Sequence, residues 1–142
     1  MIAKEDVFMI IAKGNVSTSE GPMAVEELKP GMLVVDRGHR ARKLLKVEQV
    51  QLHQTMHFKR NKNLILAGNS ILFTMMGPRT AIQMKGIRKA PYGRIQMLFE
   101  ERKLQDDVMT IQKEEVTGYR LTIENGNNVM ACGYNVADRE VE

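Results

Sequence analysis

The chain has 142 residues, with 21 Lys and Arg against 17 Asp and Glu, a formal net charge of +4 and 43% hydrophobic side chains. This size fits one domain with its own hydrophobic core, which needs no metal or disulfide to fold. A single cysteine excludes an internal disulfide, and the longest apolar runs fall far short of the ~20 residues of a membrane-spanning helix.

Short segments of β character, bounded by Gly, Pro and Asn, recur along the chain, and sustained helical periodicity is almost absent. In chain order the sequence predicts strands at Val7–Ala12, Asn15–Thr18, Met32–Asp36, Arg42–Gln54, Leu64–Leu66, Ile71–Met75, Thr80–Met84, Arg94–Phe99, Val108–Gln112, Gly118–Glu124 and Asn128–Ala131. The fold class is therefore mostly β. We expect a single domain over residues 1–142, with residues 1–8 as a lead-in and residues 139–142 as a tail.

One short helical element interrupts this pattern. The segment Met23–Leu28 lies between Pro22 and the helix-stopping sequence Lys29-Pro30-Gly31. We expect about one helical turn there, with Val25 and Leu28 facing the core, before the chain reverses into the next strand.

A polar corner lies between two apolar runs in Asn63–Phe73. The runs Leu64–Leu66 and Ile71–Phe73 flank Ala67-Gly68-Asn69-Ser70, which predicts a strand, a tight corner and a second strand. A corner of this kind is a suitable place for a catalytic group, so the identity of the residue at position 70 matters.

The charges are unevenly distributed. Residues 1–36 carry a net charge of −3, residues 37–94 carry +12 and residues 95–142 carry −5. The basic groups of the middle segment are Arg37, Arg40, Arg42 and Lys43, then Lys59, Arg60 and Lys62, and finally Lys85, Arg88 and Lys89. Such groups suit contacts with phosphates, with an acidic partner or with the acidic face of a second copy, and they also suit a solvated surface.

His39, His53 and His57 suggest a metal site, but the strand-like pattern around His53 and His57 places them too far apart on one face to share a metal ion. No Cys, Asp or Glu lies near them in the sequence, so no metal site is predicted. Cys132 has no neighbouring histidine and is interpreted as a small packing residue.

Two acidic pairs, Glu100-Glu101 and Asp106-Asp107, could be read as acid/base groups. Because adjacent residues point apart and Phe99–Asp107 reads as a solvated connection, we expect both pairs to lie on the surface.

Three segments resemble the Hint domain, the self-processing module of inteins and hedgehog proteins. Val16–Val34 has the order of its opening strand, short V-E-E-L helix and K-P-G turn. Asn63–Phe73 resembles the corner that carries a Thr-x-x-His motif, and Gly118–Val136 resembles the closing hairpin. The resemblance implies a Hint-like, intein- and hedgehog-type β-fold with one or two short helical turns.

The same resemblance implies where chemistry would occur. The nucleophile position falls on Met9, the Thr and His positions fall on Ala67 and Ser70, and the terminal His-Asn pair falls on Ala137 and Asp138. A thioether cannot accept an acyl group, and a serine hydroxyl does not titrate near neutral pH as imidazole does. All the reactive groups are thus replaced, and the chain is predicted to be a non-enzyme without cofactor or metal.

The favoured interpretation is a non-catalytic structural or assembly module that binds other protein subunits. It would form a homo-oligomer or part of a larger particle such as a phage virion. A nucleic-acid-associated basic β-barrel is the alternative, and residual self-processing is a third. The absence of a secretory leader and of apolar spans predicts a cytoplasmic protein, or a virion protein if a phage encodes it, without a membrane partner.

Overall fold

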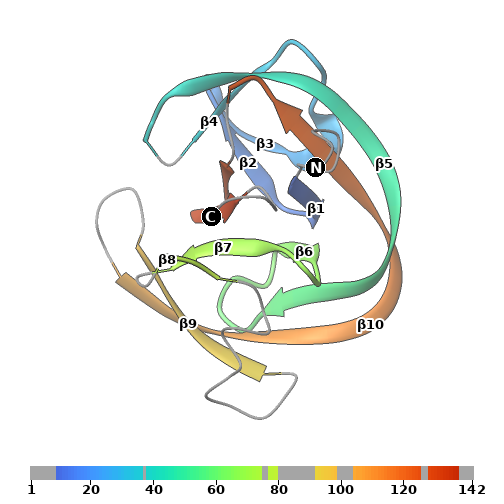
Figure 1. Ribbon diagram of the computed structural model, residues 1–142, viewed down its shortest axis with the longest axis vertical. Helices are drawn as coiled ribbons and strands as arrows, with labels where there is room; N and C mark the ends of the chain where they lie inside the picture. The colour runs from blue at the N-terminus through green and yellow to red at the C-terminus, as the bar shows by residue number, and fades with distance from the viewer. Residues whose placement is uncertain are drawn as a thin grey trace, which may run out of the picture.

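The structure is a computed structural model that describes the backbone of residues 9–36, 38–74, 77–79, 92–98, 104–125 and 128–137, and their side chains except for residues 73–79, 92–98, 104–106 and 137. Nearly all of it is antiparallel β-sheet (Figure 1). In chain order the elements are β1 (Met9–Lys13), β2 (Asn15–Thr18), β3 (Gly21–Ala24), the 3-10 turn η2 (Val25–Glu27), β4 (Leu33–Val35), β5 (Ala41–Phe58), β6 (Ile65–Ala67), β7 (Ile71–Thr74), β8 (Gly77–Arg79), β9 (Tyr92–Leu98), β10 (Leu104–Ile123), β11 (Asn128–Ala131) and β12 (Tyr134–Ala137).

Four strands close into a ring. β1 pairs with β6 and β10, and β5 pairs with the same two strands. Directly opposite residues share a face, so Ile11 and Leu66 point to the same side, and so do Leu66 and Met56. These side chains are fully buried. The ring therefore encloses one part of the hydrophobic core.

The remaining strands extend this ring into a second sheet. β4 pairs with the beginning of β5 and with β2, and β2 also pairs with β3 and β11. β11 forms a hairpin with β12, and β12 continues to β7 and β8. Because β5 belongs to both sheets, a single core cluster runs from Met9 in β1 to Val136 in β12.

β5 and β10 form a long ribbon that curves around the outside of the molecule (Figure 1). Gln54 pairs with Lys113 and Leu52 pairs with Val116, so the one residue His53 faces the two residues Glu114 and Glu115. This is a β-bulge, which locally bends a strand and strengthens its twist. The bulge explains how two strands of this length follow a curved path.

Many of the predicted elements are present. The helical turn is observed as η2, and Val25 and Leu28 are buried as expected. At the predicted reversal, Met32 N–H donates to the Lys29 carbonyl at 3.2 Å. Gly31 has φ of 98°, which a type II turn requires at its third residue, and Pro30 provides the fixed φ of the second.

Several predicted boundaries are wrong. β5 continues to Phe58, four residues past the predicted Gln54, and the strands predicted at Val108–Gln112 and Gly118–Glu124 are both parts of β10. Pairing with β5 holds the polar residues between them in the sheet. Three strands, β3, β8 and β12, are absent from the prediction. The closing hairpin consists of β11 and β12, because residues 118–123 form the last part of β10. The strand predicted at Thr80–Met84 lies outside the described residues.

Candidate functional site

The corner between β6 and β7 is formed as predicted. β6 ends at Ala67 and β7 begins at Ile71. Ser70 N–H donates to the Ala67 carbonyl at 3.0 Å, and Gly68 N–H donates to the Gln54 carbonyl of β5 at 3.0 Å. These bonds fix the backbone of the corner against the neighbouring strand.

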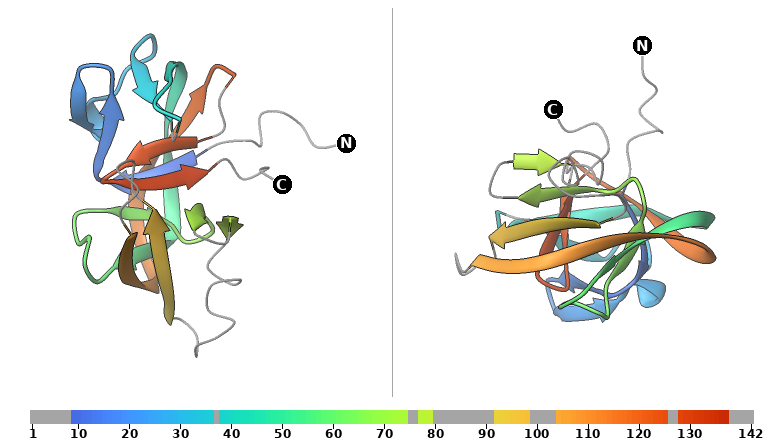
Figure 2. Two further views of the ribbon diagram at one scale, coloured as in Figure 1. Left: turned by 90° about the vertical axis from the view of Figure 1, so that its left-hand side faces the viewer. Right: turned by 90° about the horizontal axis from the view of Figure 1, so that it is seen from below.

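The sheet register brings the other family positions toward this corner. Ala137, the last residue of β12, pairs with Ile71, which directly follows Ser70. Ile11 pairs with Leu66, so Met9 lies two residues further along β1, toward the corner. β1 begins and β12 ends on the same side of the molecule (Figure 2). Asp138 lies outside the described residues.

The side chains at these positions offer little chemistry. Met9, Ala67 and Ser70 are only 2%, 3% and 6% exposed. Met9 shares the core-facing side of its strand with Ile11 and belongs to the core cluster, whereas Ala67 follows Leu66 and faces the opposite side of the sheet. A buried thioether and a methyl group, pointing to opposite faces, cannot act together on one peptide bond.

Thr55 lies directly across from Ala67 on β5 and belongs to a polar cluster. The Glu114 carboxylate accepts a bond from the Thr55 hydroxyl at 2.5 Å and lies 2.5 Å from His57 Nε2. The same Nε2 atom lies 3.0 Å from the Thr55 hydroxyl. The hydrogen bond from Thr55 and, after it, that from His57 hold the pKa of Glu114 below its ordinary value.

This cluster is not arranged as a nucleophilic triad. In such a triad the hydroxyl and the carboxylate bond to different nitrogens of the imidazole, so that one activates the nucleophile and the other orients the ring. Here both contact Nε2. The cluster therefore ties β5 to the bulge of β10 and does not activate Thr55.

Both histidines on β5 have acidic partners that the sequence does not indicate. His57 is paired with Glu114, and His53 Nδ1 lies 3.7 Å from Glu115, although both carboxylates are far from the histidines in the sequence. Within the described residues, no three His, Cys, Asp or Glu side chains are grouped closely enough to hold a metal ion. His39 lies in the loop before β5 with a φ of 63°.

Asp107 is not on the surface, which corrects the prediction of a solvated connection at Phe99–Asp107. It lies in β10 and is 1% exposed. Its carboxylate accepts from the backbone N–H groups of Arg60 at 2.7 Å, Val108 at 2.8 Å and Asn61 at 3.3 Å, and from the hydroxyl of the fully buried Tyr134. We call this set the Asp107 cluster. Glu100 and Glu101 lie outside the described residues.

The Asp107 cluster joins three segments that are distant in sequence. It holds the turn after β5, β10 itself and the start of β12, where the Tyr134 ring packs edge-to-face on Phe58 with centroids 5.2 Å apart. A buried carboxyl group of this kind needs several hydrogen-bond donors to offset the cost of removing it from water. No local pattern in the sequence indicates this site, because its partners come together only in the fold.

Those of the predicted contact residues that the structure describes fall at the two ends of β5. At its start, Asp36 accepts from Arg42 Nε at 3.1 Å and lies 3.6 Å from Arg40 Nε, while Lys43 is exposed. Burial would raise the pKa of Asp36, but the backbone N–H of Arg40, the Arg42 side chain and the backbone N–H of Gly38 lower it by a larger amount. Arg37, Lys85, Arg88 and Lys89 lie outside the described residues.

At the other end, Lys59, Arg60 and Lys62 form what we call the basic turn, between β5 and β6. All three are exposed, and within the described part of the chain none of them forms an ion pair. The two basic groups thus lie at opposite ends of β5.

Cys132 is a turn residue. It has φ of 51° and Gly133 has φ of 85°, and together they connect Ala131 with its partner Tyr134, as in a type I′ hairpin. The half-buried Sγ lies 3.4 Å from the Asn15 backbone nitrogen. The interpretation as a packing residue fits this position.

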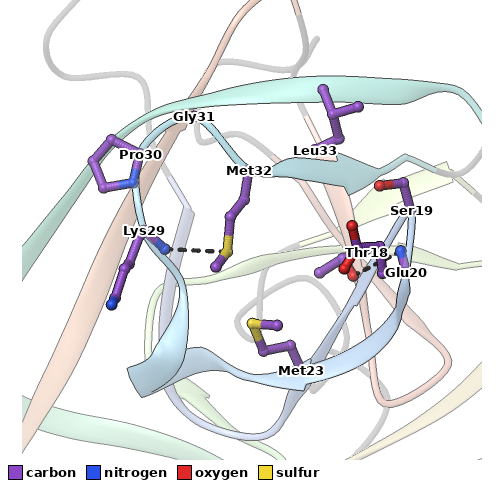
Figure 3. A pocket seen from close by; sticks show the side chains of 9 residues that line it. All are labelled: Thr18, Ser19, Glu20, Met23, Lys29, Pro30, Gly31, Met32 and Leu33. Atoms are coloured by element: carbon purple, nitrogen blue, oxygen red, sulfur yellow. Dashed lines mark hydrogen bonds between the residues drawn. The ribbon is translucent and has the colours of Figure 1, made fainter.

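An open groove of about 620 Å³ lies on the second sheet, between the β2–β3 hairpin and the segment that leads into β4 (Figure 3). It is lined by Thr18, Ser19, Glu20, Met23, Lys29, Pro30, Gly31, Met32 and Leu33. No helix in the described part of the chain has the length and hydropathy needed to cross a lipid bilayer.

Solved structures with a similar fold include several inteins. The chain aligns with the gp41-1 intein over 92% of its own length and 98% of the intein, at 14% identity and a TM-score of 0.68. A bacterial intein-like domain from Clostridium thermocellum aligns with 91% of this chain over 97% of its own length, at 13% identity and a TM-score of 0.68. A DnaB intein from Synechocystis sp. aligns with 92% of this chain over 97% of its own length, at 12% identity and a TM-score of 0.65. No protein-family profile and no curated protein matches the sequence.

The chain has the Hint fold of inteins, which confirms the fold that the motif resemblance implied. At these identities the likeness concerns the fold alone.

Proposed function

We propose that this chain is a Hint-fold protein without self-processing activity, and that it acts as a structural module that assembles with other protein subunits. A particle such as a phage virion is the kind of assembly that it would join. The observation that carries the proposal is the side-chain content of the corner: Met9, Ala67 and Ser70 are buried and include no acyl acceptor paired with a base.

Self-processing needs a nucleophile that a neighbouring base can deprotonate. Met9 has no acidic proton, and its thioether packs in the core. Ser70 has a hydroxyl, but among the described residues no histidine is hydrogen-bonded to it, and His57 contacts Glu114 and Thr55 instead. The corner therefore supports a role in the architecture of the fold.

The test places the chain between two reporter domains and follows the intact mass of the fusion. The gp41-1 intein between the same reporters is the positive control. The expected result is a single uncleaved mass after prolonged incubation with and without a thiol. A ligated reporter pair, or fragments that begin near Met9 or end near Asp138, would overturn the proposal.

Nucleic-acid association is a second candidate, because the basic turn has no ion pair within the described residues. Contacts of Lys and Arg with phosphates lose affinity steeply as salt rises. Binding of a labelled DNA duplex at low salt, lost at moderate salt, would favour it. The separation of the two basic groups along β5 is the reason for placing it second.

A further inference from the structure

The groove of Figure 3 has an apolar floor and an acidic rim. Met23 and Met32 point toward one another in its middle, and Leu33, an exposed leucine at 43%, lies at its edge in β4. The hydroxyl of Thr18 donates to the Gly21 carbonyl at 2.5 Å and accepts from Glu20 N–H at 3.2 Å, so it is used within the hairpin. The groove thus offers apolar surface more than free polar groups.

Of the three carboxylates that we call the acidic rim, Glu20 lines the groove. Glu26 and Glu27 do not line it but lie next to it in the sequence, in η2, which connects Met23 of one wall with Lys29 of the other. All three are exposed, and within the described residues none forms an ion pair. Lys29 is the one cation among the lining residues, and its side chain extends from the far rim, away from Glu20 (Figure 3).

The basic turn has the complementary chemistry. Its backbone is fixed, because Arg60 and Asn61 N–H donate to Asp107 and the Asn61 side-chain amide donates to the Cys132 carbonyl at 2.7 Å. Its three cations therefore extend from a rigid support. Long basic side chains place their aliphatic stems on apolar surface and their charged ends beside carboxylates, which matches a groove of thioethers with an acidic rim.

We infer that the groove receives the basic turn of a second copy of this chain. The turn follows the end of β5, whereas the groove lies beside β4, which pairs with the start of β5. A contact between two different surfaces is heterologous, and it generates a ring or a filament. The inference rests on the proposed structural role and specifies the contact that would build the assembly.

The test is a charge exchange. The turn variant carries Lys59→Glu, Arg60→Glu and Lys62→Glu, and the groove variant carries Glu20→Lys, Glu26→Lys and Glu27→Lys. Each variant alone opposes like charges at the contact, so we expect the dissociation constant of self-association to rise by about tenfold or more. An equimolar mixture restores opposite charges at both kinds of contact, and association should return.

Sedimentation velocity at low and high salt measures the association, and thermal unfolding of each variant checks that it is folded. A variant with Lys46→Glu and Lys113→Glu is the matched control, because it also inverts exposed cations but changes no residue of the basic turn, no residue that lines the groove and none that pairs with β4. It should associate like the original chain. Association of the original chain should weaken with salt, since exposed charge pairs are screened.

Three outcomes would overturn the inference. The first is an original chain that stays monomeric at millimolar concentration and low salt. The second is a folded turn variant that associates as well as the original chain. The third is a turn variant that loses affinity for a DNA duplex while its self-association is unchanged, which would assign the turn to nucleic acid. None of these outcomes changes the mass of the reporter fusion, so a failure here is distinguishable from a failure of the proposed function.

Discussion

The corner at Ser70 and the Asp107 cluster are both buried, but they differ in the polar groups that they contain. At the corner, where the fold of inteins would place its chemistry, the neighbouring positions hold a thioether and a methyl group. At Asp107 a carboxylate accepts from three backbone N–H groups and one hydroxyl. The comparison indicates that buried polar interactions serve to hold segments together here.

The largest effect is expected from Asp107→Ala. The change removes the carboxylate that accepts from the Tyr134 hydroxyl and from the N–H groups of Arg60 and Asn61. Hydrogen bonds to a charged group and the desolvation of buried donors predict a loss of about 3 kcal/mol in the free energy of unfolding. Urea unfolding measures it. A loss below about 1 kcal/mol would show that the cluster does not hold the fold together.

Tyr134→Phe isolates one bond of the same cluster. The ring keeps its edge-to-face contact with Phe58, and only the hydroxyl is removed. We expect a loss of about 1.5 kcal/mol, which urea unfolding would detect. In the Asp107→Ala background the same substitution should cost much less, because its partner is already absent. Equal costs in both backgrounds would contradict the proposed coupling.

A smaller effect on the free energy of unfolding, and one that depends on pH, is expected from Glu114→Gln. Its pKa is lowered in the folded state from an ordinary value of 4.5, first by Thr55 and then by His57. A lowered pKa contributes stability at pH values above the ordinary value, and this contribution is lost as pH falls through the folded pKa. The free energies of unfolding of the original chain and of Glu114→Gln should therefore converge below pH 4.5. A difference in the free energy of unfolding between the two proteins that stays constant from neutral to acidic pH would contradict this prediction.

The smallest effect is expected from Ser70→Ala. If the corner is only a packing element, removing one hydroxyl should change the free energy of unfolding by less than about 1 kcal/mol, and it should leave the mass of the reporter fusion unchanged. Thermal unfolding is sufficient to measure this. A loss as large as that of Asp107→Ala would show that the two regions do not differ in the way described.

The sequence predicts best what local geometry determines. The K-P-G reversal, the short helical turn with Val25 and Leu28, and the corner at Ala67–Ser70 all follow from turn residues and neighbouring apolar positions. These segments also led to the correct fold. Their signals lie within a few residues of one another, so no tertiary information is needed to recognise them.

The features that the sequence does not predict depend on contacts between residues that are far apart in the chain. Asp107 meets Arg60 across 47 residues and Tyr134 across 27, and His57 meets Glu114 across 57. The polar segment in the middle of β10 remains a strand because β5 pairs with it. The local pattern predicts Phe99–Asp107 as an exposed connection, since charged residues are buried only when partners are present to satisfy them.

The central proposal is that this chain has the fold of inteins but that Met9, Ala67 and Ser70, the described residues at the corner, do not break a peptide bond. Intact-mass analysis of the chain between two reporter domains tests it most directly. We predict one species with the mass of the full fusion, while the gp41-1 intein control releases ligated reporters. Ligated or cleaved reporters from this chain would contradict the claim.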